Sequence, residues 1–239
     1  MPFISLGLAP TLAQAAAELG FTAPTPIQLE AIPAVLGGAD LLATAQTGSG
    51  KTAAFALPLL QRLQTGPMHT PRRVRALVLV PTRELAAQVG EVLRSLAQHL
   101  PSRPRIAVAF GGVSINPQLM ALRGGADVMV ATPGRLLDLV EHNALRLSAV
   151  ELLVLDEADR MLDLGFADEL DRVLALLPAK RQNLFFSATF PPAVEALAGG
   201  LLRDPQRVDV PAPAQAEAVI LQRAIAVDAS RRTQLLRQL

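Results

Sequence analysis

The 239-residue chain contains no cysteine, tryptophan or tyrosine, and aromatic residues make up only 3% of it. Without cysteine the protein can form no disulfide, no thiolate metal site and no cysteine nucleophile, which fits a reducing compartment. So few aromatic rings leave little surface on which nucleic-acid bases could stack. A nucleic acid that binds this protein should therefore be held mainly through its backbone.

Targeting and membrane signals are also missing from the sequence. The N-terminus has no secretion-signal pattern, and no uninterrupted apolar run approaches the roughly 18 residues of a transmembrane helix. The formal net charge is only +1, so the chain as a whole has no strong attraction for polyanions. Hydrophobic residues make up 51% of the sequence, which is enough for a packed core. We expect a globular, cytoplasmic protein without a membrane span.

Six short apolar segments lack the polar alternation of strands that face water on one side. Each is followed by a polar or Gly/Pro-containing turn and, in most cases, by a helical stretch, as in residues 53–63 and 85–99. Strands buried on both faces are typical of parallel sheets. The sequence therefore predicts an α/β fold with a central, mostly parallel sheet and helices on both faces. The predicted strands are residues 41–44, 76–80, 106–110, 128–131, 152–155 and 184–186.

Three carboxylates, Asp156, Glu157 and Asp159, directly follow the predicted strand 152–155. In a parallel sheet with right-handed crossovers, the carboxyl ends of all strands lie along one edge, where ligands bind. Unpaired buried carboxylates are unfavourable, so this cluster needs a cation, hydrogen-bond donors or open water. A metal-bound nucleotide would supply the cation.

The loop at residues 45–52 is rich in glycine and lies between a predicted strand and a predicted helix. Backbone N–H groups of such a loop can surround phosphate oxygens, Lys51 can bridge the terminal phosphates, and the Thr52 hydroxyl can bind Mg²⁺. Ala45 stands where the usual phosphate-loop pattern has glycine. A fortuitous glycine-rich turn is the alternative, but the strand-loop-helix context predicts a nucleotide site.

Isolated polar residues near other segment ends are open to two interpretations. Gln28 lies in the first turn of a predicted helix after two prolines, which fix the backbone and so the direction of its side chain. Taken alone, the segment could also be a rigid turn that carries a surface glutamine. Arg83 and Arg135 each follow a predicted strand, where they could bind phosphates or form surface salt bridges. A third group of arginines is expected to form a solvated loop: Arg72, Arg73 and Arg75.

Taken together, these motifs resemble those of the DEAD-box ATP-dependent RNA helicases, whose name is spelled by residues 156–159. Residues 45–52 match that family's version of the phosphate loop, including Ala45, and residues 20–28 resemble its adenine-sensing motif. The other matches are to its RNA-backbone motifs (81–86, 111–112 and 132–135) and its coupling motif (187–189). The resemblance covers essentially the whole chain and implies a RecA-like P-loop fold. Within the family, the chain is similar to the bacterial RhlE-type members.

The resemblance implies roles for individual residues in binding and hydrolysing ATP. Gln28 would read the adenine edge, Phe3 would pack on the base, and Lys51 would contact the phosphates. Asp156 would bind Mg²⁺ together with Thr52, and Glu157 would position and deprotonate the attacking water. Lys51, Asp156 and Glu157 are thus the implied catalytic residues. The full set implied to bind ATP is Phe3, Phe21, Gln28, Thr47, Gly48, Ser49, Gly50, Lys51 and Thr52.

The same resemblance implies an RNA site and a coupling site. The residues implied to contact the RNA backbone are Arg83, Gly112, Thr132 and Arg135. Asp159, Ser187 and Thr189 would couple the nucleotide state to the position of loop 187–189, because hydroxyls can hydrogen-bond to a carboxylate. The alternative for loop 187–189 is that its hydroxyls merely cap the helix after Pro191.

The domain prediction is a RecA-like, ATP-binding helicase domain at residues 1–210, a linker at 211–218, and the start of a second, truncated RecA-like domain at 219–239. This last segment would comprise a strand at 219–227 and a helix at 230–239. By the resemblance, the missing C-terminal domain supplies arginine fingers and half of the RNA track. We therefore expect a monomer that binds RNA, and ATP or ADP with Mg²⁺, but hydrolyses ATP weakly and unwinds no duplex alone.

Two other functions remain open from the sequence. One is a related ATPase that acts on DNA or remodels proteins. The other is a nucleotide-dependent RNA clamp without enzymatic activity, against which the intact Glu157 argues.

Overall fold

The structure is a computed structural model that describes residues 2–46, 48–65, 70–210, 225–228 and 231–236. Its centre is a seven-stranded sheet in the order β3-β4-β2-β5-β6-β1-β7, in which every neighbouring pair of strands is parallel. The strands are β1 (Leu41–Thr44), β2 (Ala76–Leu79), β3 (Ile106–Ala109), β4 (Val128–Ala131), β5 (Leu152–Leu155), β6 (Gln182–Ser187) and β7 (Gln206–Asp209). The predicted α/β fold with a parallel sheet is confirmed.

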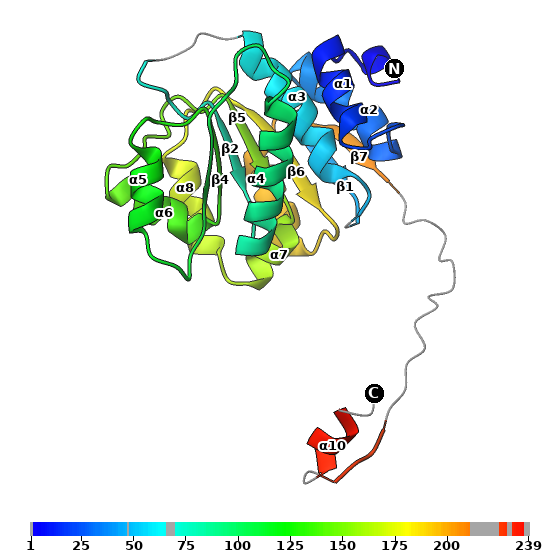
Figure 1. Cartoon of the computed structure of the whole chain (residues 1–239), viewed down its shortest axis with the longest axis vertical. Coiled ribbons are helices and arrows are strands. Elements are labelled where there is room, and N and C mark those ends of the chain that lie inside the picture. Colours follow the sequence, from blue (N-terminus) through cyan, green and yellow to red (C-terminus); the bar gives the residue numbers. More distant parts are fainter. Residues whose placement is uncertain (1, 47, 66–69, 211–224, 229–230, 237–239) are drawn as a thin grey trace.

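Helices cover both faces of this sheet (Figure 1). One apolar cluster joins the sheet to α1–α4 and a second joins it to α5–α9. The helical elements are η1 (Ile4–Leu6), α1 (Pro10–Glu18), α2 (Pro26–Gly37), α3 (Lys51–Thr65), α4 (Arg83–Ala97), α5 (Asn116–Leu122), α6 (Pro133–Glu141), α7 (Ala158–Asp163), α8 (Ala167–Ala175), α9 (Pro192–Leu201) and α10 (Arg232–Leu236).

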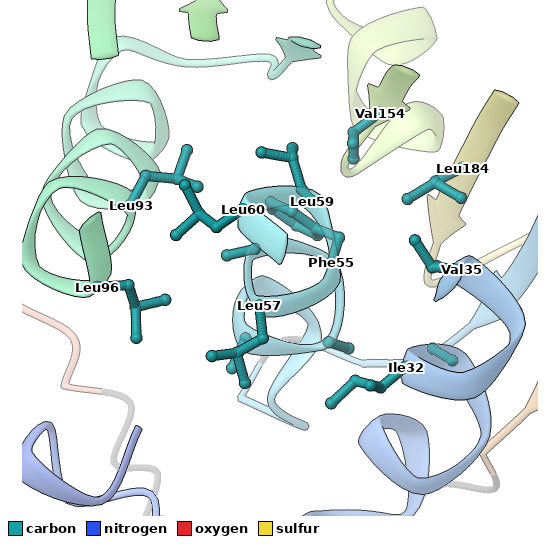
Figure 2. Close-up of a cluster of buried hydrophobic side chains, with 14 of the residues drawn as sticks. Ile32, Val35, Phe55, Leu57, Leu59, Leu60, Leu93, Leu96, Val154 and Leu184 are labelled. Carbon is teal, nitrogen blue, oxygen red and sulfur yellow. The ribbon is translucent and has the colours of Figure 1, made fainter. Parts of the chain in front are cut away.

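The two-sided burial explains why the central strands are apolar throughout. In β5, Val154 belongs to the cluster beneath α1–α4, whereas its neighbours Leu153 and Leu155 belong to the cluster beneath α5–α9. Successive side chains of a strand point to opposite faces, so both faces need apolar residues. Figure 2 shows the first cluster, in which Val154 and Leu184 of the sheet lie above α3. Because helices cover both faces of the sheet, a ligand can reach it only at the strand ends.

The structure extends the sheet beyond the six predicted strands. β7 was not predicted, because Val208 is the only buried residue in it and the strand pairs on one side only, with β1. β6 begins two residues earlier than predicted, at the buried Gln182 and Asn183. Asn183 is compatible with burial because its backbone N–H and its side-chain amide both donate to Asp40. Neither segment has the apolar pattern by which strands are recognised in a sequence.

The prediction of a solvated arginine loop is wrong for Arg75. The Arg75 side chain is 5% exposed and pairs with Glu151 through Nε to Oε1 at 2.9 Å and Nη2 to Oε2 at 3.0 Å. Its Nη1 also donates to the Leu63 carbonyl at 2.9 Å. Arg72 is half-buried and forms an ion pair with Asp127. Only Arg73 of this group is fully exposed.

The C-terminal predictions are only partly covered by the structure. The linker 211–218 and most of the predicted strand 219–227 lie outside the described residues, and residues 225–228 have no regular structure. α10 falls within the helix expected at 230–239. In the described part of the chain, no helix combines the length and the apolar character that crossing a membrane requires.

Candidate active site

The parallel strands place the sequence motifs along the carboxyl edge of the sheet in two groups. The phosphate loop follows β1, the carboxylate cluster follows β5, and Ser187 ends β6, which lies between those two strands. The candidate RNA contacts instead follow β2, β3 and β4, which form the other half of the sheet. The two groups meet where β2 pairs with β5. The strand order therefore separates the candidate nucleotide residues from the candidate RNA contacts along one edge.

The phosphate loop leads directly into α3. Gly48 and Gly50 have φ of +82° and +95°, in the left-handed region that glycine adopts without strain. A Cβ at Gly50 would lie 2.6 Å from Gln28 Nε2, so a larger residue would not fit there. Lys51 is 6% exposed, and its Nζ donates to the Ala45 carbonyl at 3.0 Å. Thr47 lies outside the described residues.

A cavity of about 450 Å³ lies beside this loop. Its lining residues come from the phosphate loop, from the carboxylate cluster and from α4, together with Phe21. They are Phe21, Gly48, Gly50, Lys51, Thr52, Ala53, Leu85, Gln88, Val92, Asp156 and Glu157. The structure thus brings together most of the residues implied to bind ATP and Mg²⁺.

Three lining residues, Leu85, Gln88 and Val92, were not predicted from the sequence. They lie three and four residues apart on α4, so they share one face of that helix. Their periodicity could have identified that face. It could not have shown that the face borders the cavity, because that depends on how α4 packs against the sheet.

Gln28 connects α2 to the phosphate loop. It is 2% exposed, its Oε1 accepts a hydrogen bond from Thr25 N at 3.0 Å, and its Nε2 donates to the Gly50 carbonyl at 3.1 Å. The alternative of a surface glutamine is therefore wrong. These two bonds use one N–H donor and one oxygen lone pair, so the amide keeps one further donor and one further acceptor with which it could read an adenine edge.

The two phenylalanines implied to bind ATP occupy different environments. Phe21 is half-buried and lines the cavity. Phe3 is 1% exposed and belongs to the apolar cluster beneath α1–α4. A ring this deeply buried offers no face to an incoming base, because its surface is already covered by aliphatic side chains. The structure contradicts the base-packing prediction for Phe3 and leaves Phe21 as the aromatic residue at the cavity.

Asp156 is the most deeply buried carboxylate of the cluster. It is 2% exposed, and its Oδ1 has no hydrogen-bond partner among the described residues. Burial raises the pKa of Asp156 to about 6, and the positive charge of Lys51 partly opposes that increase. A buried carboxylate oxygen without a partner, bordering the same cavity as the Thr52 hydroxyl, has the donor chemistry that Mg²⁺ prefers.

The protein could hold Mg²⁺ only with help from another ligand. No group of three or more His, Cys, Asp or Glu side chains suited to a metal occurs within the described ranges. Mg²⁺ commonly binds through one or two protein oxygens together with nucleotide phosphates and water. Thr52 and Asp156 therefore fit the magnesium of a metal-nucleotide complex better than a metal bound by protein alone.

Glu157 lies beside Asp156 in an unusual backbone conformation. Its φ is +55° and its ψ is 51°, which is rare for a residue with a side chain. Its carboxylate is partly buried, lies 3.4 Å from Arg160 Nη1, and borders the cavity. Such strain is often found at functional sites. The conformation brings the carboxylate to the cavity where α7 begins.

Asp159 links the carboxylate cluster to the loop after β6. Its Oδ2 accepts hydrogen bonds from Thr189 N at 2.9 Å and Thr189 Oγ1 at 2.8 Å, and its backbone N–H donates to Ser187 Oγ at 3.2 Å. Burial raises the pKa of Asp159, but hydrogen bonds from Thr189, Arg160 and Ser187 outweigh it and hold the pKa below its usual value. The helix-capping alternative is wrong, because α9 has Pro191 at its N-cap and no side-chain cap.

The two arginines among the four candidate RNA contacts differ in exposure and in the partners of their guanidinium groups. Arg83 begins α4, is exposed, and pairs with Glu84 at 2.6 Å. Arg135 is 9% exposed and its Nη2 donates to the Val113 carbonyl at 2.7 Å, but its Nε and Nη1 have no hydrogen-bond partner in the described part of the chain. Arg135 Nε does lie 3.3 Å from Asp138 Oδ2, without hydrogen-bond geometry. The salt-bridge alternative thus holds for Arg83 in this structure and only partly for Arg135.

Gly112 and Thr132 lie near Arg135. Gly112 is exposed with a φ of +78°, and Thr132 precedes α6 without capping it through its side chain. The hydrogen bond from Arg135 to Val113 ties the loop after β3 to the start of α6. The exposed backbone of Gly112 is accessible to a phosphate oxygen, whereas Thr132 and Arg135 are buried in this structure and would have to move to reach one.

Comparison with known proteins matches most of this chain to one family. A family model described as DEAD/DEAH box helicase matches residues 25–197. The DEAD-box ATP-dependent RNA helicase CshA of Bacillus cereus (strain ATCC 10987 / NRS 248) is 45% identical over 210 residues, covering 88% of this chain and 39% of that protein. The ATP-dependent RNA helicase DbpA of Escherichia coli (strain K12) is 48% identical over 193 residues, covering 81% of this chain and 41% of that protein.

A third relative, the ATP-dependent RNA helicase DeaD of Mycobacterium tuberculosis (strain CDC 1551 / Oshkosh), is 46% identical over 206 residues, covering 86% of this chain and 36% of that protein. The chain thus spans about two fifths of the length of these curated relatives. The matched residues include the phosphate loop, the carboxylate cluster and loop 187–189. With its parallel α/β sheet and this match over most of its length, the chain belongs to the DEAD/DEAH box helicase family.

Proposed function

We propose that this chain is the ATP-binding half of an ATP-dependent RNA helicase that couples ATP hydrolysis to local duplex unwinding or ribonucleoprotein remodelling. The observation that carries the proposal is the unpartnered Asp156 Oδ1, which borders one cavity together with Lys51 and Thr52. A buried anionic oxygen beside a lysine and a hydroxyl suits a metal-nucleotide complex. The relatives described above carry the name of RNA helicases, which supports RNA as the substrate class.

The residues around the cavity divide the work of ATP hydrolysis. Lys51 and the N–H groups of the phosphate loop bind and orient the phosphates at the start of α3, where the helix dipole favours negative charge. Thr52 and Asp156 would hold Mg²⁺, which neutralises charge on the phosphates when it is bound. Glu157 orients the attacking water and accepts its proton. Phe21 and Gln28 receive the adenine, Phe21 as an aromatic surface and Gln28 as a hydrogen-bonding amide.

Asp159, Ser187 and Thr189 form the coupling group in this proposal. Asp159 lies two residues after Glu157, and its hydrogen bonds to Thr189 connect the hydrolytic side chains to the loop after β6. A change at the nucleotide therefore has a direct route to that loop. Such a route is what a helicase needs if hydrolysis is to alter its grip on RNA.

The half of the edge with the candidate RNA contacts would hold the phosphate backbone. Arg135 would turn its guanidinium group toward a phosphate, since its buried Nε and Nη1 have no hydrogen-bond partner within the described residues; Arg83 can exchange its exposed salt bridge for a phosphate, and Gly112 and Thr132 supply backbone and hydroxyl donors. Contacts of this kind carry little base information, so we expect low sequence specificity. Residues 1–210, which carry both the nucleotide residues and the RNA contacts, would form one RecA-like ATP-binding domain.

This chain covers only about two fifths of the length of these relatives, and we propose that full activity requires a C-terminal RecA-like domain. This chain would bind ATP or ADP with Mg²⁺, hydrolyse ATP weakly and separate no strands, because loss of an arginine finger lowers rates by about 10³- to 10⁵-fold. We also propose that it is monomeric and cytoplasmic. Duplex unwinding by the isolated 239-residue chain would contradict this part of the proposal.

The test is ATP hydrolysis by the full-length protein with no nucleic acid, with single-stranded RNA and with DNA of the same sequence. We expect stimulation by RNA and little by DNA. Equal stimulation by DNA would favour a DNA-directed ATPase, and stimulation by neither would favour a protein-remodelling ATPase. Binding of a fluorescent ATP analogue by the isolated chain, measured in parallel, checks the nucleotide site independently.

A further inference from the structure

The amino edge of the sheet, opposite the candidate active site, carries a large excess of positive charge. The segments that lead into the four adjacent strands β2, β3, β4 and β5 are residues 70–75, 101–105, 123–127 and 142–151. They hold seven arginines and two carboxylates, a formal charge of +5, whereas the whole chain has +1, so the remaining residues sum to −4. The charge of the protein is therefore strongly polarised toward this edge.

Most of these arginines are exposed. The pair between the buried Arg75 and the exposed Glu151 contributes no net charge, which leaves six arginines and Asp127. We call these six the arginine edge: Arg72, Arg73, Arg103, Arg105, Arg123 and Arg146. Arg72 pairs with Asp127, and Arg105 donates from Nη2 to the Ala121 carbonyl. The other four form no ion pair or side-chain hydrogen bond within the residues that the structure describes.

Two hollows bring together four members of the arginine edge. A cavity of about 300 Å³ is lined by Arg72, Arg73 and Arg146. A much smaller hollow is lined by Arg72 and Arg103, together with Asp127. Arg72 borders both hollows, so these four arginines, from three of the segments, lie around neighbouring depressions of one surface. Such a group can contact more than one phosphate of a polynucleotide chain.

The backbone beneath the arginine edge is closely packed. Gly125 has a φ of +70°, and a Cβ there would lie 2.3 Å from the Arg72 carbonyl oxygen. A Cβ at Gly124 would lie 2.0 Å from Arg105 Nη1. The buried Arg75 also fixes the segment before β2 against Glu151 and Leu63. These contacts fix the backbone from which the arginine side chains extend, and four of the six side chains have no ion pair or side-chain hydrogen bond within the described residues.

The surroundings favour a nucleic-acid backbone over a protein partner. Protein interfaces usually contain a buried apolar or aromatic centre. Among the described residues, the large apolar side chains that are exposed all lie outside the four segments of this edge. The cavity is lined by three arginines and by mostly small residues, and its two larger apolar residues, Val74 and Leu145, are buried and half-buried. Guanidinium groups without an apolar centre match phosphate oxygens, which they bind with two parallel hydrogen bonds.

We propose that the arginine edge is a second RNA-binding surface, which holds the phosphodiester backbone of RNA outside the segment bound at the carboxyl edge. The two surfaces lie at opposite ends of the strands, and a four-residue strand alone is about 13 Å long. A short single strand cannot follow both, whereas a structured or long RNA can bend around the domain. This inference depends on the proposed function only for the identity of the polyanion.

The test uses Arg73→Glu/Arg146→Glu, two exposed members without partners in the described chain. RNA binding is measured by fluorescence anisotropy with a structured RNA, from about 50 to 200 mM salt. We expect affinity to fall about tenfold or more, and the slope of log affinity against log salt to fall by about 1.4, from two lost phosphate contacts. The matched control is Arg203→Glu/Arg207→Glu, the same change in charge at exposed residues near β7 at the other end of the sheet.

Each outcome separates the two proposals. An unchanged affinity in Arg73→Glu/Arg146→Glu, or an equal loss in the control, overturns the second surface. Loss of binding to polyglutamate in the arginine variant with RNA binding unchanged would show an acidic protein surface as the partner, and also overturns it. A parallel Arg135→Ala variant tests the carboxyl edge: if it alone weakens RNA binding, the proposed function stands without the second surface.

A second variant guards against misfolding. Arg103→Glu/Arg123→Glu changes two other members of the arginine edge, from the segments before β3 and β4. Thermal unfolding within a few degrees of the unmodified protein shows that each variant is folded. The proposal requires both double variants to weaken RNA binding while binding of the fluorescent ATP analogue stays within about twofold.

Discussion

Asp159 and Thr189 are joined by two hydrogen bonds to a single oxygen: Asp159 Oδ2 accepts from the Thr189 backbone N–H at 2.9 Å and from its hydroxyl at 2.8 Å. The two residues follow neighbouring strands, β5 and β6. Removing one of them should therefore affect both the packing of the two loops and any communication between them.

Thr189→Val removes the hydroxyl and keeps the shape and the backbone N–H. We expect a loss of about 1 kcal/mol in the free energy of unfolding, and in the full-length protein a loss of unwinding with ATP hydrolysis largely retained. Thr44→Val is the matched control, since Thr44 Oγ1 donates to Asp209 near the edge of the sheet. Equal effects on unwinding from both substitutions would show that the Asp159–Thr189 contact is only structural.

The same contact should make the protein sensitive to acid. The net effect of the hydrogen bonds to Asp159 is a pKa below its usual value. A carboxyl with a lowered pKa in the folded state contributes stability above its unfolded pKa, near 4, and loses it as pH falls through the folded pKa. We expect Asp159→Asn to reduce the acid dependence of unfolding below about pH 4. The urea midpoint is measured at several pH values for both proteins. If the midpoint of the variant falls with pH as steeply as that of the native chain, the prediction is wrong.

Asp156 should show the opposite dependence, because burial raises its pKa to about 6. A raised pKa means that the folded state favours the proton, so this group's stabilising effect is present at low pH and is lost as pH rises through about 6. Asp156→Asn should therefore raise the melting temperature of the nucleotide-free protein at pH 7.5 by about 2–4 °C, by a smaller amount at pH 5, and hardly at all below the unfolded pKa near 4.

The same substitution should impair metal-dependent nucleotide binding. Without an anionic oxygen to bind Mg²⁺, we expect Asp156→Asn to lower the affinity for Mg²⁺-ADP by at least about tenfold. Calorimetric titration with and without Mg²⁺ measures this. A variant that is destabilised at pH 7.5, or that binds Mg²⁺-ADP as tightly as the native chain, would contradict the assigned role of the buried carboxylate.

Glu157→Gln tests the proposed base. It keeps the size of the side chain and removes the proton acceptor, so turnover by the full-length protein should fall by about 10²- to 10⁴-fold while ATP binding is spared. The control is Glu195→Gln on α9, an exposed glutamate on a cavity away from the phosphate loop. Unchanged turnover in Glu157→Gln would contradict the assignment of Glu157 as the base, whereas absence of turnover in the native full-length protein would favour the nucleotide-dependent clamp.

Gln28→Ala tests adenine selectivity. The native chain should prefer ATP over GTP by at least about tenfold, and the variant should lose this preference. Gln61→Ala is a matched control, because Gln61 accepts from Ala9 N at 2.7 Å and donates to the Gly7 carbonyl at 2.8 Å, which also bridges two segments. Equal affinity of the native chain for ATP and GTP would contradict the proposal, whatever the variants do.

Local patterns predicted much of the fold from the sequence. Continuous apolar segments identified six of the seven strands, because strands buried on both faces need apolar side chains at every position. β7 could not be found this way, since it is an edge strand with one buried residue. The glycine-rich loop and the carboxylates were recognised because their chemistry is carried by short runs of neighbouring residues.

The environment of individual side chains was harder to predict. Phe3 and Phe21 are both aromatic residues near the N-terminus, yet one is buried in the core and the other lines the cavity. Arg73 and Arg75 are two residues apart, yet one is exposed and the other forms a buried ion pair. Exposure depends on which elements pack over a residue, and those elements are distant in the sequence.

The sequence by itself determined the kind of elements, the motifs and the fact that all of them lie at one edge, since strand ends in a parallel sheet share an edge. Only the tertiary structure decided the strand order. That order places β6 between β1 and β5, so that Ser187 and Thr189 lie beside the carboxylates, and it collects the arginines of four segments at the opposite edge. Strand order results from packing across the whole domain, which no local pattern encodes.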